Sequence, residues 1–242
     1  MSLPYVRRQN SLGSPHSVRN SREMASLEPL ARVLNTGIVA IIRAPRGDQL
    51  VEVAEALLAG GIDVMEVTFT IPGAIGVLEQ VASRLGNRIL LGAGTVLDTE
   101  TARAAILAGA EFIVSPSTNV EIIQLCKRYS KLIMPGAFTP TEVVTAWQAG
   151  ADIVKVFPSD VHGPKYLKAL RGPFPHVRLM PTGGVTLETA GDFLKAGACA
   201  LGIGGSLVEP KALADRDLAR IESLSRQFVE TVRNARGALH AS

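Results

Sequence analysis

The sequence lacks several features that would point to specific classes of protein. It has two cysteines in 242 residues, Cys126 and Cys199, which are too few for a disulfide framework or a zinc site. No apolar run approaches the ~18 residues that span a membrane, and the nucleotide-binding patterns G-x-G-x-x-G and the P-loop are absent. His162, His176 and His240 are not spaced as metal ligands. We therefore expect a cytoplasmic protein without a metal site or a membrane partner.

The net charge of +3 comes from the first residues of the chain. Residues 1–23 contain four arginines and a single acidic residue, so residues 24–242 are neutral overall and give no basis for a nucleic-acid partner. Residues 1–23 are rich in serine and arginine without periodicity, which leaves open a transit peptide, a disordered tail or a start assigned too early. We favour Met24 as the natural start, with Ser26 capping an amphipathic helix.

Apolar strand-like segments alternate with helix-period segments from Gly37 onward. Such alternation is typical of a parallel sheet, and eight units in this length predict a single (β/α)₈ TIM barrel over residues 24–242, with a helix at its N-terminal end. The predicted strands are Ile38–Ile42, Val64–Phe69, Ile89–Leu91, Phe112–Val114, Leu132–Met134, Ile153–Phe157, Arg178–Met180 and Cys199–Ile203.

Lys155 lies within the apolar segment Ile153–Phe157, on the sixth predicted strand. Burial disfavours the ammonium form and lowers its pKa, which leaves a neutral amine able to attack a carbonyl carbon. The alternative is a lysine whose stem is buried while its charged end reaches water. Glu66 lies in a similar apolar setting on the second strand. It is either a proton-transferring carboxyl group or the partner of a basic neighbour such as Arg43 or Lys155.

Glycine-rich loops follow the seventh and eighth predicted strands. Gly183-Gly184 and Gly204-Gly205-Ser206 allow backbone N–H groups to converge near helix N-termini, as in the phosphate sites of TIM barrels. A buried lysine, a buried glutamate and an anion site together indicate Schiff-base chemistry on a phosphorylated keto compound. Two other classes remain open: a non-catalytic phosphate-binding barrel, and an isomerase or synthase that uses Glu66 without a covalent step.

From about Gly37 to Val208 the sequence resembles one family, the class I 2-keto-3-deoxy-6-phosphogluconate (KDPG) aldolases, which overlap with the 4-hydroxy-2-oxoglutarate (KHG) aldolases. The resemblance implies cleavage of KDPG to pyruvate and glyceraldehyde 3-phosphate, and alternative substrates are 4-hydroxy-2-oxoglutarate and the galactonate epimer of KDPG. The matching segments are Ile38-Val-Ala-Ile-Ile-Arg-Ala, Gly61-Ile-Asp-Val-Met-Glu-Val-Thr, Gly92-Ala-Gly-Thr-Val-Leu, Phe112-Ile-Val-Ser-Pro, Met134-Pro-Gly, Val154-Lys-Val-Phe-Pro, Gly172-Pro-Phe-Pro, Pro181-Thr-Gly-Gly-Val and Gly204-Gly-Ser.

The resemblance also assigns roles to individual residues. Lys155 is similar to the Schiff-base lysine, Glu66 to the general acid/base and Thr95 to a hydroxyl that contacts the keto acid, while Pro116 and Phe157 shape the pocket. The family is typically homotrimeric and uses neither a metal nor a cofactor other than the lysine adduct. The residues that resemble the phosphate site are Thr182, Gly183, Gly184, Gly204, Gly205 and Ser206.

Thr70 departs from the pattern of the family. Some members have an arginine at this position, four residues after the glutamate, where it binds the carboxylate of pyruvate. We expect Arg43, at the end of the first strand, to bind this carboxylate instead, because a guanidinium can hold a carboxylate through two parallel hydrogen bonds. Thr70 remains a candidate substrate contact, and its identity leaves the choice of keto acid open.

Overall fold

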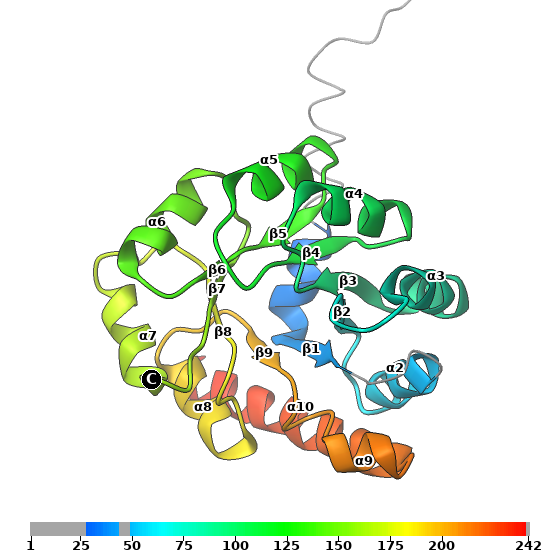
Figure 1. The fold of residues 1–242 in the computed structure, drawn as a ribbon. Coiled ribbons are helices and arrows are strands. Elements are labelled where there is room, and N and C mark those ends of the chain that lie inside the picture. Colours follow the sequence, from blue (N-terminus) through cyan, green and yellow to red (C-terminus); the bar gives the residue numbers. More distant parts are fainter. Residues whose placement is uncertain (1–27, 44–48, 241–242) are drawn as a thin grey trace, which may run out of the picture.

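The computed structural model describes residues 28–43 and 49–240. These residues form an α/β fold in which a curled parallel sheet is surrounded by helices (Figure 1). The strands are β1 (Ile38–Ile42), β2 (Val64–Thr68), β3 (Leu90–Gly94), β4 (Phe112–Val114), β5 (Leu132–Met134), β6 (Gly136–Ala137), β7 (Val154–Val156), β8 (Leu179–Pro181) and β9 (Leu201–Ile203).

All eight predicted strands are present, with ends that differ by a few residues. The predicted fifth strand continues as a separate short strand, β6, because Pro135 has no N–H group and interrupts the ladder between β5 and β6. The strand order is β5-β4-β3-β2-β1-β9 in one sheet and β6-β7-β8 in the other. A parallel bridge between Thr182 and Gly202 links β8 to β9, and the N–H of Lys155 donates to the Pro135 carbonyl.

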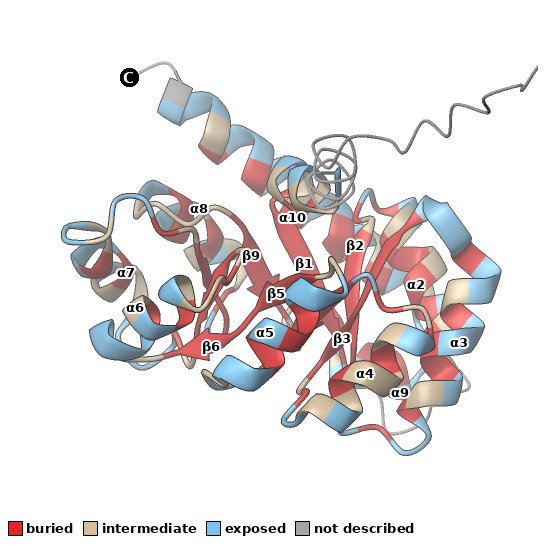
Figure 2. Cartoon of the chain, turned by 90° about the horizontal axis from the view of Figure 1, so that it is seen from above, coloured by how far each residue is buried: buried red, intermediate tan, exposed pale blue. Residues whose placement is uncertain are grey.

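Helices follow the strands and cover the outside of the sheet, as expected for βα units. They are α2 (Leu50–Ala59), α3 (Ala74–Leu85), the 3₁₀ turn η2 (Gly86–Arg88), α4 (Thr99–Leu107), α5 (Val120–Arg128), α6 (Pro140–Gln148), α7 (Gly163–Arg171), α8 (Leu187–Lys195), α9 (Pro210–Ala214) and α10 (Leu218–His240). Figure 2 shows that the strands are buried and that the outer faces of the helices are exposed. None of the described helices is long and apolar enough to cross a bilayer.

The apolar residues form two cores, one on each face of the sheet. The larger lies between the strands and the surrounding helices, and the smaller lies inside the curled sheet around Phe112, Val64 and Ile153. Gly92 makes room for Phe112, since a Cβ there would lie 2.2 Å from the ring. Side chains of neighbouring residues alternate between the two faces. Every second residue of a strand therefore points into the interior of the curled sheet.

A helix that includes residues 28–36 closes one end of the inner core. Val33 belongs to this core, and Leu30 and Leu34 pack against it. Arg32 forms a 2.6 Å ion pair with Asp63, which also accepts a hydrogen bond from the Thr36 hydroxyl. The predicted N-cap at Ser26 and the predicted start at Met24 lie outside the described residues, as does the whole of the segment 1–23.

Candidate active site

Glu66 and Lys155 point into the interior of the curled sheet. Val64 and Ile153, two residues before them, belong to the inner core, and residues two apart on a strand share a face. In the strand registers Glu66 lies opposite Gly92 on β3, and Lys155 lies opposite Gly136 on β6. Only 1% of Glu66 and 3% of Lys155 is exposed, so both ionisable groups are buried.

Burial and mutual charge shift the pKa values of this pair. Burial lowers the pKa of Lys155, the Glu66 carboxylate opposes that shift, and the Arg43 guanidinium adds to it. Burial likewise raises the pKa of Glu66, while the charges of Lys155 and Arg43 act to lower it. The result is an amine that loses its proton more readily than a surface lysine and a carboxyl group that holds its proton more strongly. Three groups from β1, β2 and β7 thus interact within one site.

The Glu66 carboxyl group is tightly enclosed but incompletely hydrogen-bonded. Gly94 permits its position, since a Cβ there would lie 2.4 Å from Oε1 of Glu66. Oε2 of Glu66 is buried and has no hydrogen-bond partner within the described part of the chain. Thr95 follows with φ of 60°, a left-handed conformation that is unusual for a β-branched residue and recurs at functional sites. An unpaired buried oxygen is available for proton transfer with a substrate.

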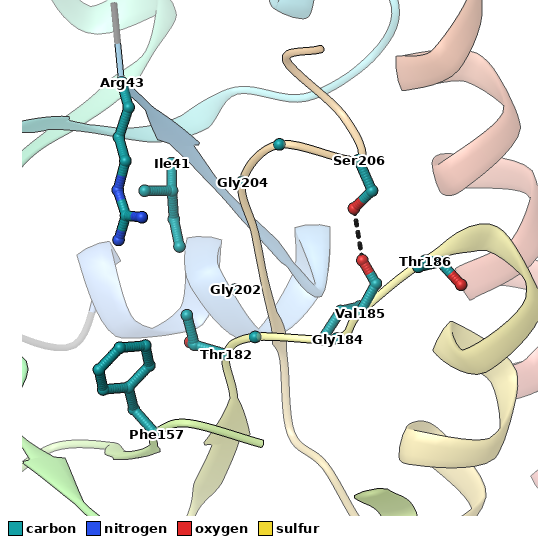
Figure 3. Close-up of a pocket in the computed structure, with 12 residues that line it drawn as sticks. Ile41, Arg43, Phe157, Thr182, Gly184, Val185, Thr186, Gly202, Gly204 and Ser206 are labelled. Atoms are coloured by element: carbon teal, nitrogen blue, oxygen red, sulfur yellow. Dashed lines mark hydrogen bonds between the residues drawn. The ribbon is translucent and has the colours of Figure 1, made fainter. Parts of the chain in front are cut away.

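A cavity of about 270 Å³ opens at the carboxyl ends of β1, β7, β8 and β9 (Figure 3). Arg43 and Phe157 lie on one side of it and the two glycine-rich loops on the other. The Nζ atom of Lys155 lies 5.0 Å from the ring centroid of Phe157, which itself borders the cavity. Neither Lys155 nor Glu66 borders the cavity directly. The residues around the cavity are Ile41, Arg43, Phe157, Thr182, Gly183, Gly184, Val185, Thr186, Gly202, Gly204, Gly205 and Ser206.

The two glycine-rich loops meet at this cavity and are joined by a hydrogen bond. The Ser206 hydroxyl donates to the carbonyl of Val185, as Figure 3 shows. Gly183 and Gly184 have φ of 92° and 67°, which glycine adopts without steric cost. Helix α8 begins immediately after this loop, with Thr186 as its N-cap. Backbone N–H groups at a helix start, with its positive dipole end, favour an anion.

The second loop, Gly204-Gly205-Ser206, also resembles the start of a helix. The N–H groups of Leu207 and Val208 both donate to the carbonyl of Gly204, so the chain turns as at the start of a helix. In such a turn the N–H groups of the preceding residues, here Gly205 and Ser206, have no partner inside the turn. Both residues border the cavity. The two loops are therefore suited to bind a phosphate group between them.

The predicted site residues Thr70, Thr95 and Pro116 do not border the cavity. The carbonyl oxygen of Pro116 packs at Gly136, the residue opposite Lys155, where a Cβ would lie 2.2 Å from it. Thr70 is exposed, and its hydroxyl lies 3.1 Å from that of buried Thr68. The Thr68 hydroxyl donates to the carbonyl of Ile42, next to Arg43. Thr70 is thus linked to the end of the strand that leads to Arg43.

The sequence reasoning missed residues that border the cavity without a chemical signature. Ile41, Val185 and Gly202 border it through their places at strand or loop ends. Gly202 is required because a Cβ would lie 2.2 Å from the Thr182 hydroxyl oxygen. The alternation of β1 could have identified Ile41, since Val39 and Ile41 share its inner face.

The cysteines and histidines do not form a second reactive centre in the described residues. Burial raises the pKa of the Cys126 thiol to about 12 and that of Cys199 to about 11, so both remain protonated. Residues 28–43 and 49–240 contain no group of three or more His, Cys, Asp or Glu side chains that could hold a metal ion.

Replacing Gly184 with alanine tests the anion loops. We expect the KM for a phosphorylated substrate to rise about tenfold or more, because the added Cβ would lie 2.8 Å from the Cβ of Asp160 and φ of 67° disfavours alanine. Steady-state kinetics of the variant check this, and Gly76→Ala on α3, where a Cβ has open space, is the control. An unchanged KM for phosphorylated substrates would remove the loop from phosphate binding.

Comparison with known proteins shows similarity to one family. Residues 31–224 match the family model described as KDPG and KHG aldolase. The chain is 35% identical to 2-dehydro-3-deoxy-phosphogluconate aldolase of Pseudomonas aeruginosa over 211 residues, which cover 86% of this chain and 94% of that protein. It is 32% identical over 199 residues to 2-dehydro-3-deoxy-6-phosphogalactonate aldolase of Escherichia coli, covering 82% of this chain and 95% of that protein.

A solved structure with a bound substrate fragment is also similar. It is KDPG aldolase from Legionella pneumophila with pyruvate captured at low pH as a covalent carbinolamine intermediate. The two chains superpose with a TM-score of 0.77 and 30% sequence identity, covering 82% of this chain and 96% of that chain. The similarity therefore extends over most of both chains.

Proposed function

Because this chain belongs to the KDPG and KHG aldolase family, we propose that it is a class I aldolase that reversibly cleaves KDPG to pyruvate and glyceraldehyde 3-phosphate. It is then a lyase that uses Lys155 as its covalent group and needs neither a metal nor another cofactor. One observation carries the proposal: Lys155 and Glu66 are both buried and interact electrostatically, and Lys155 contacts Phe157, which borders a cavity between two glycine-rich loops.

The reaction begins with attack of the neutral Lys155 amine on the C2 carbonyl of the substrate. The hydroxyl of the resulting carbinolamine takes up a proton from the solvent and leaves as water, which gives a protonated iminium that accepts electrons from the C3–C4 bond. Burial favours the initial attack, because it lowers the pKa of Lys155 and so increases the fraction of neutral amine.

Glu66 then moves the protons. As a carboxylate it removes the proton of the C4 hydroxyl while the C3–C4 bond breaks, which releases glyceraldehyde 3-phosphate and leaves an enamine on Lys155. The protonated Glu66 returns the proton to C3, and hydrolysis of the iminium releases pyruvate. A raised pKa suits a group that alternates between accepting and donating a proton. The free Oε2 of Glu66 is the atom available for this transfer.

The choice of substrate follows from the anion loops. A phosphate on the aldehyde end fits the side of the cavity that is formed by the two glycine-rich loops, whereas the smaller 4-hydroxy-2-oxoglutarate has no phosphate to place there. We expect kcat/KM to be highest for KDPG or its galactonate epimer and lower for 4-hydroxy-2-oxoglutarate. Pyruvate release from each of the three keto acids, followed with a coupled dehydrogenase, decides among them. Faster cleavage of the unphosphorylated acid would assign the enzyme to 4-hydroxy-2-oxoglutarate.

Arg43 supplies the positive charge for the carboxylate of the keto acid. The proposal is supported by two observations: Arg43 borders the cavity, and its charge acts on both Lys155 and Glu66. The resemblance implies that Thr70 stands where some members have arginine, and its hydroxyl contacts that of Thr68. Arg43 thus takes the clamp role, with a bidentate contact to the carboxylate.

We expect Arg43→Ala to raise the KM for pyruvate in the condensation direction by about 10- to 100-fold, the cost of losing charge-assisted hydrogen bonds. Steady-state rates at several pyruvate concentrations measure this. Arg84→Ala, at an exposed arginine on α3, is the matched control. If Arg43→Ala leaves both KM and kcat unchanged, Arg43 does not bind the carboxylate.

The fold proposal is a closed (β/α)₈ barrel preceded by an N-terminal helix. Its support is that β5 and β6 count as one strand interrupted at Pro135 and that the Thr182–Gly202 bridge links the two sheets. We propose further that the enzyme is a cytoplasmic homotrimer, on the strength of the family resemblance and the low cysteine content. Light scattering coupled to size-exclusion chromatography tests the trimer, and a monomeric mass contradicts it.

A further inference from the structure

Ser159 lies between the strand of the nucleophile and the first anion loop. It follows β7 by three residues and is 4% exposed. Its hydroxyl donates to the carbonyl of Val156 at 2.7 Å and accepts from the N–H of Thr182 at 3.2 Å. Its own N–H donates to the carbonyl of Thr182 at 2.8 Å. Ser159 is thus hydrogen-bonded to both the N–H and the C=O of Thr182, and to the carbonyl of Val156, the residue that follows Lys155.

The anion loop rests on the segment formed by Ser159 and Asp160. A Cβ at Gly183 would lie 3.3 Å from the N atom of Ser159, and a Cβ at Gly184 would lie 2.8 Å from the Cβ of Asp160. Because there is no room for a Cβ at Gly184 and little at Gly183, the loop packs closely on this segment and has little freedom to shift without moving it. The position of Gly183 and Gly184 is therefore set by the segment that leaves β7.

Thr182 transmits this arrangement to the cavity. Its N–H donates to both the Val156 carbonyl, at 2.9 Å, and the Ser159 hydroxyl. Its own hydroxyl is buried, borders the cavity and has no hydrogen-bond partner in the described part of the chain. A shift of the Thr182 peptide would displace this hydroxyl together with the N–H groups of the loop behind it.

We propose that Ser159 is a positioning residue: its hydroxyl holds the Thr182–Gly184 loop in the geometry that binds the phosphate end of the substrate. Ser159 does not border the cavity, and its hydroxyl bonds to the backbone of Val156 and Thr182, so it acts on affinity for the phosphate and leaves the chemical step unaffected. The proposal rests on the proposed aldolase function, but phosphate binding alone can test it. It predicts that loss of the hydroxyl weakens the binding of phosphorylated substrates and leaves the binding of unphosphorylated substrates unchanged.

Ser159→Ala is the direct test. We expect the KM for KDPG and the dissociation constant of inorganic phosphate to rise about five- to tenfold, as for loss of a buried neutral hydrogen bond. The kcat for KDPG, the KM for pyruvate and the rate on 4-hydroxy-2-oxoglutarate should stay within about twofold of the wild type. Ser225→Ala is the matched control, because Ser225 is a fully buried serine of α10 whose hydroxyl donates to the carbonyl of Ile221.

Two outcomes would overturn the proposal. One is an unchanged affinity of Ser159→Ala for both KDPG and inorganic phosphate. The other is an equal loss on phosphorylated and unphosphorylated substrates, which would mean that Ser159 supports Lys155 rather than the loop. If Ser159→Ala does not fold, Ser159→Cys, which keeps the size but weakens the hydrogen bond, takes its place. Absence of cleavage by the wild type contradicts the aldolase function, while titration calorimetry with inorganic phosphate still tests Ser159.

Discussion

Lys155→Met will reduce the cleavage of KDPG by a factor on the order of 10⁴ or more and will abolish the covalent adduct with pyruvate. Methionine fills a similar volume in the buried site, so the fold should persist, but it has no nucleophilic nitrogen. Initial rates of pyruvate release measure the loss, with circular dichroism as the check on folding. Every later step of the proposed cleavage depends on the bond that this nitrogen forms with the substrate.

A matched lysine variant separates a catalytic effect from a general effect of charge. Lys165→Met removes an exposed lysine of α7, on the helix that follows the strand of Lys155, and should leave the rate within about twofold of the wild type. Retention of more than about 1% of the wild-type rate by Lys155→Met would exclude the Schiff-base mechanism. In that case an isomerase or synthase that uses Glu66 alone becomes the better account.

Glu66→Gln will lower kcat by about 10²- to 10⁴-fold while still permitting the adduct between Lys155 and pyruvate. The amide has nearly the same shape as the carboxyl group but cannot accept and return a proton. Because a Cβ at Gly94 would already meet Oε1, the side chain has little room to reorient. Steady-state rates and borohydride trapping on the same preparation measure the two steps separately.

The same variant makes a prediction about pH. The charge of Glu66 raises the pKa of Lys155 against the effect of burial. Removing this charge therefore lowers the pKa of Lys155 further, and the pH midpoint of adduct formation should move to lower pH. Glu79→Gln, at an exposed glutamate of α3, should leave the midpoint unchanged. A shift to higher pH in Glu66→Gln would contradict the electrostatic pairing of Glu66 with Lys155.

The sequence could predict that Glu66 and Lys155 are buried because each lies where the strand pattern conflicts with its polarity. Glu66 and Lys155 interrupt apolar strands, and the alternation of strand residues places both on the inner face. Gly183 and Gly184 could be predicted because their positions after a strand are typical of phosphate loops. Local pattern and general barrel geometry were sufficient for these residues.

Other features depend on contacts that are distant in sequence. Ser159 matters through hydrogen bonds to Thr182, which lies 23 residues away, and nothing in its own neighbourhood indicates this partner. Position 202 on β9 must be glycine because a Cβ there would clash with the hydroxyl of Thr182, which follows the neighbouring strand β8. The division of the predicted fifth strand at Pro135 follows from hydrogen-bond pairing, which the apolar pattern does not encode.

The most direct test of the account is to incubate the protein with pyruvate, reduce it with borohydride and map the added mass by peptide mass spectrometry. We expect one adduct per chain, with the mass of reduced pyruvate, on the peptide that contains Lys155. Reduction without pyruvate and Lys155→Met with pyruvate should both give no adduct. An unmodified Lys155 in the complete reaction, or an adduct at another lysine, would contradict the central claim that Lys155 is the Schiff-base nucleophile.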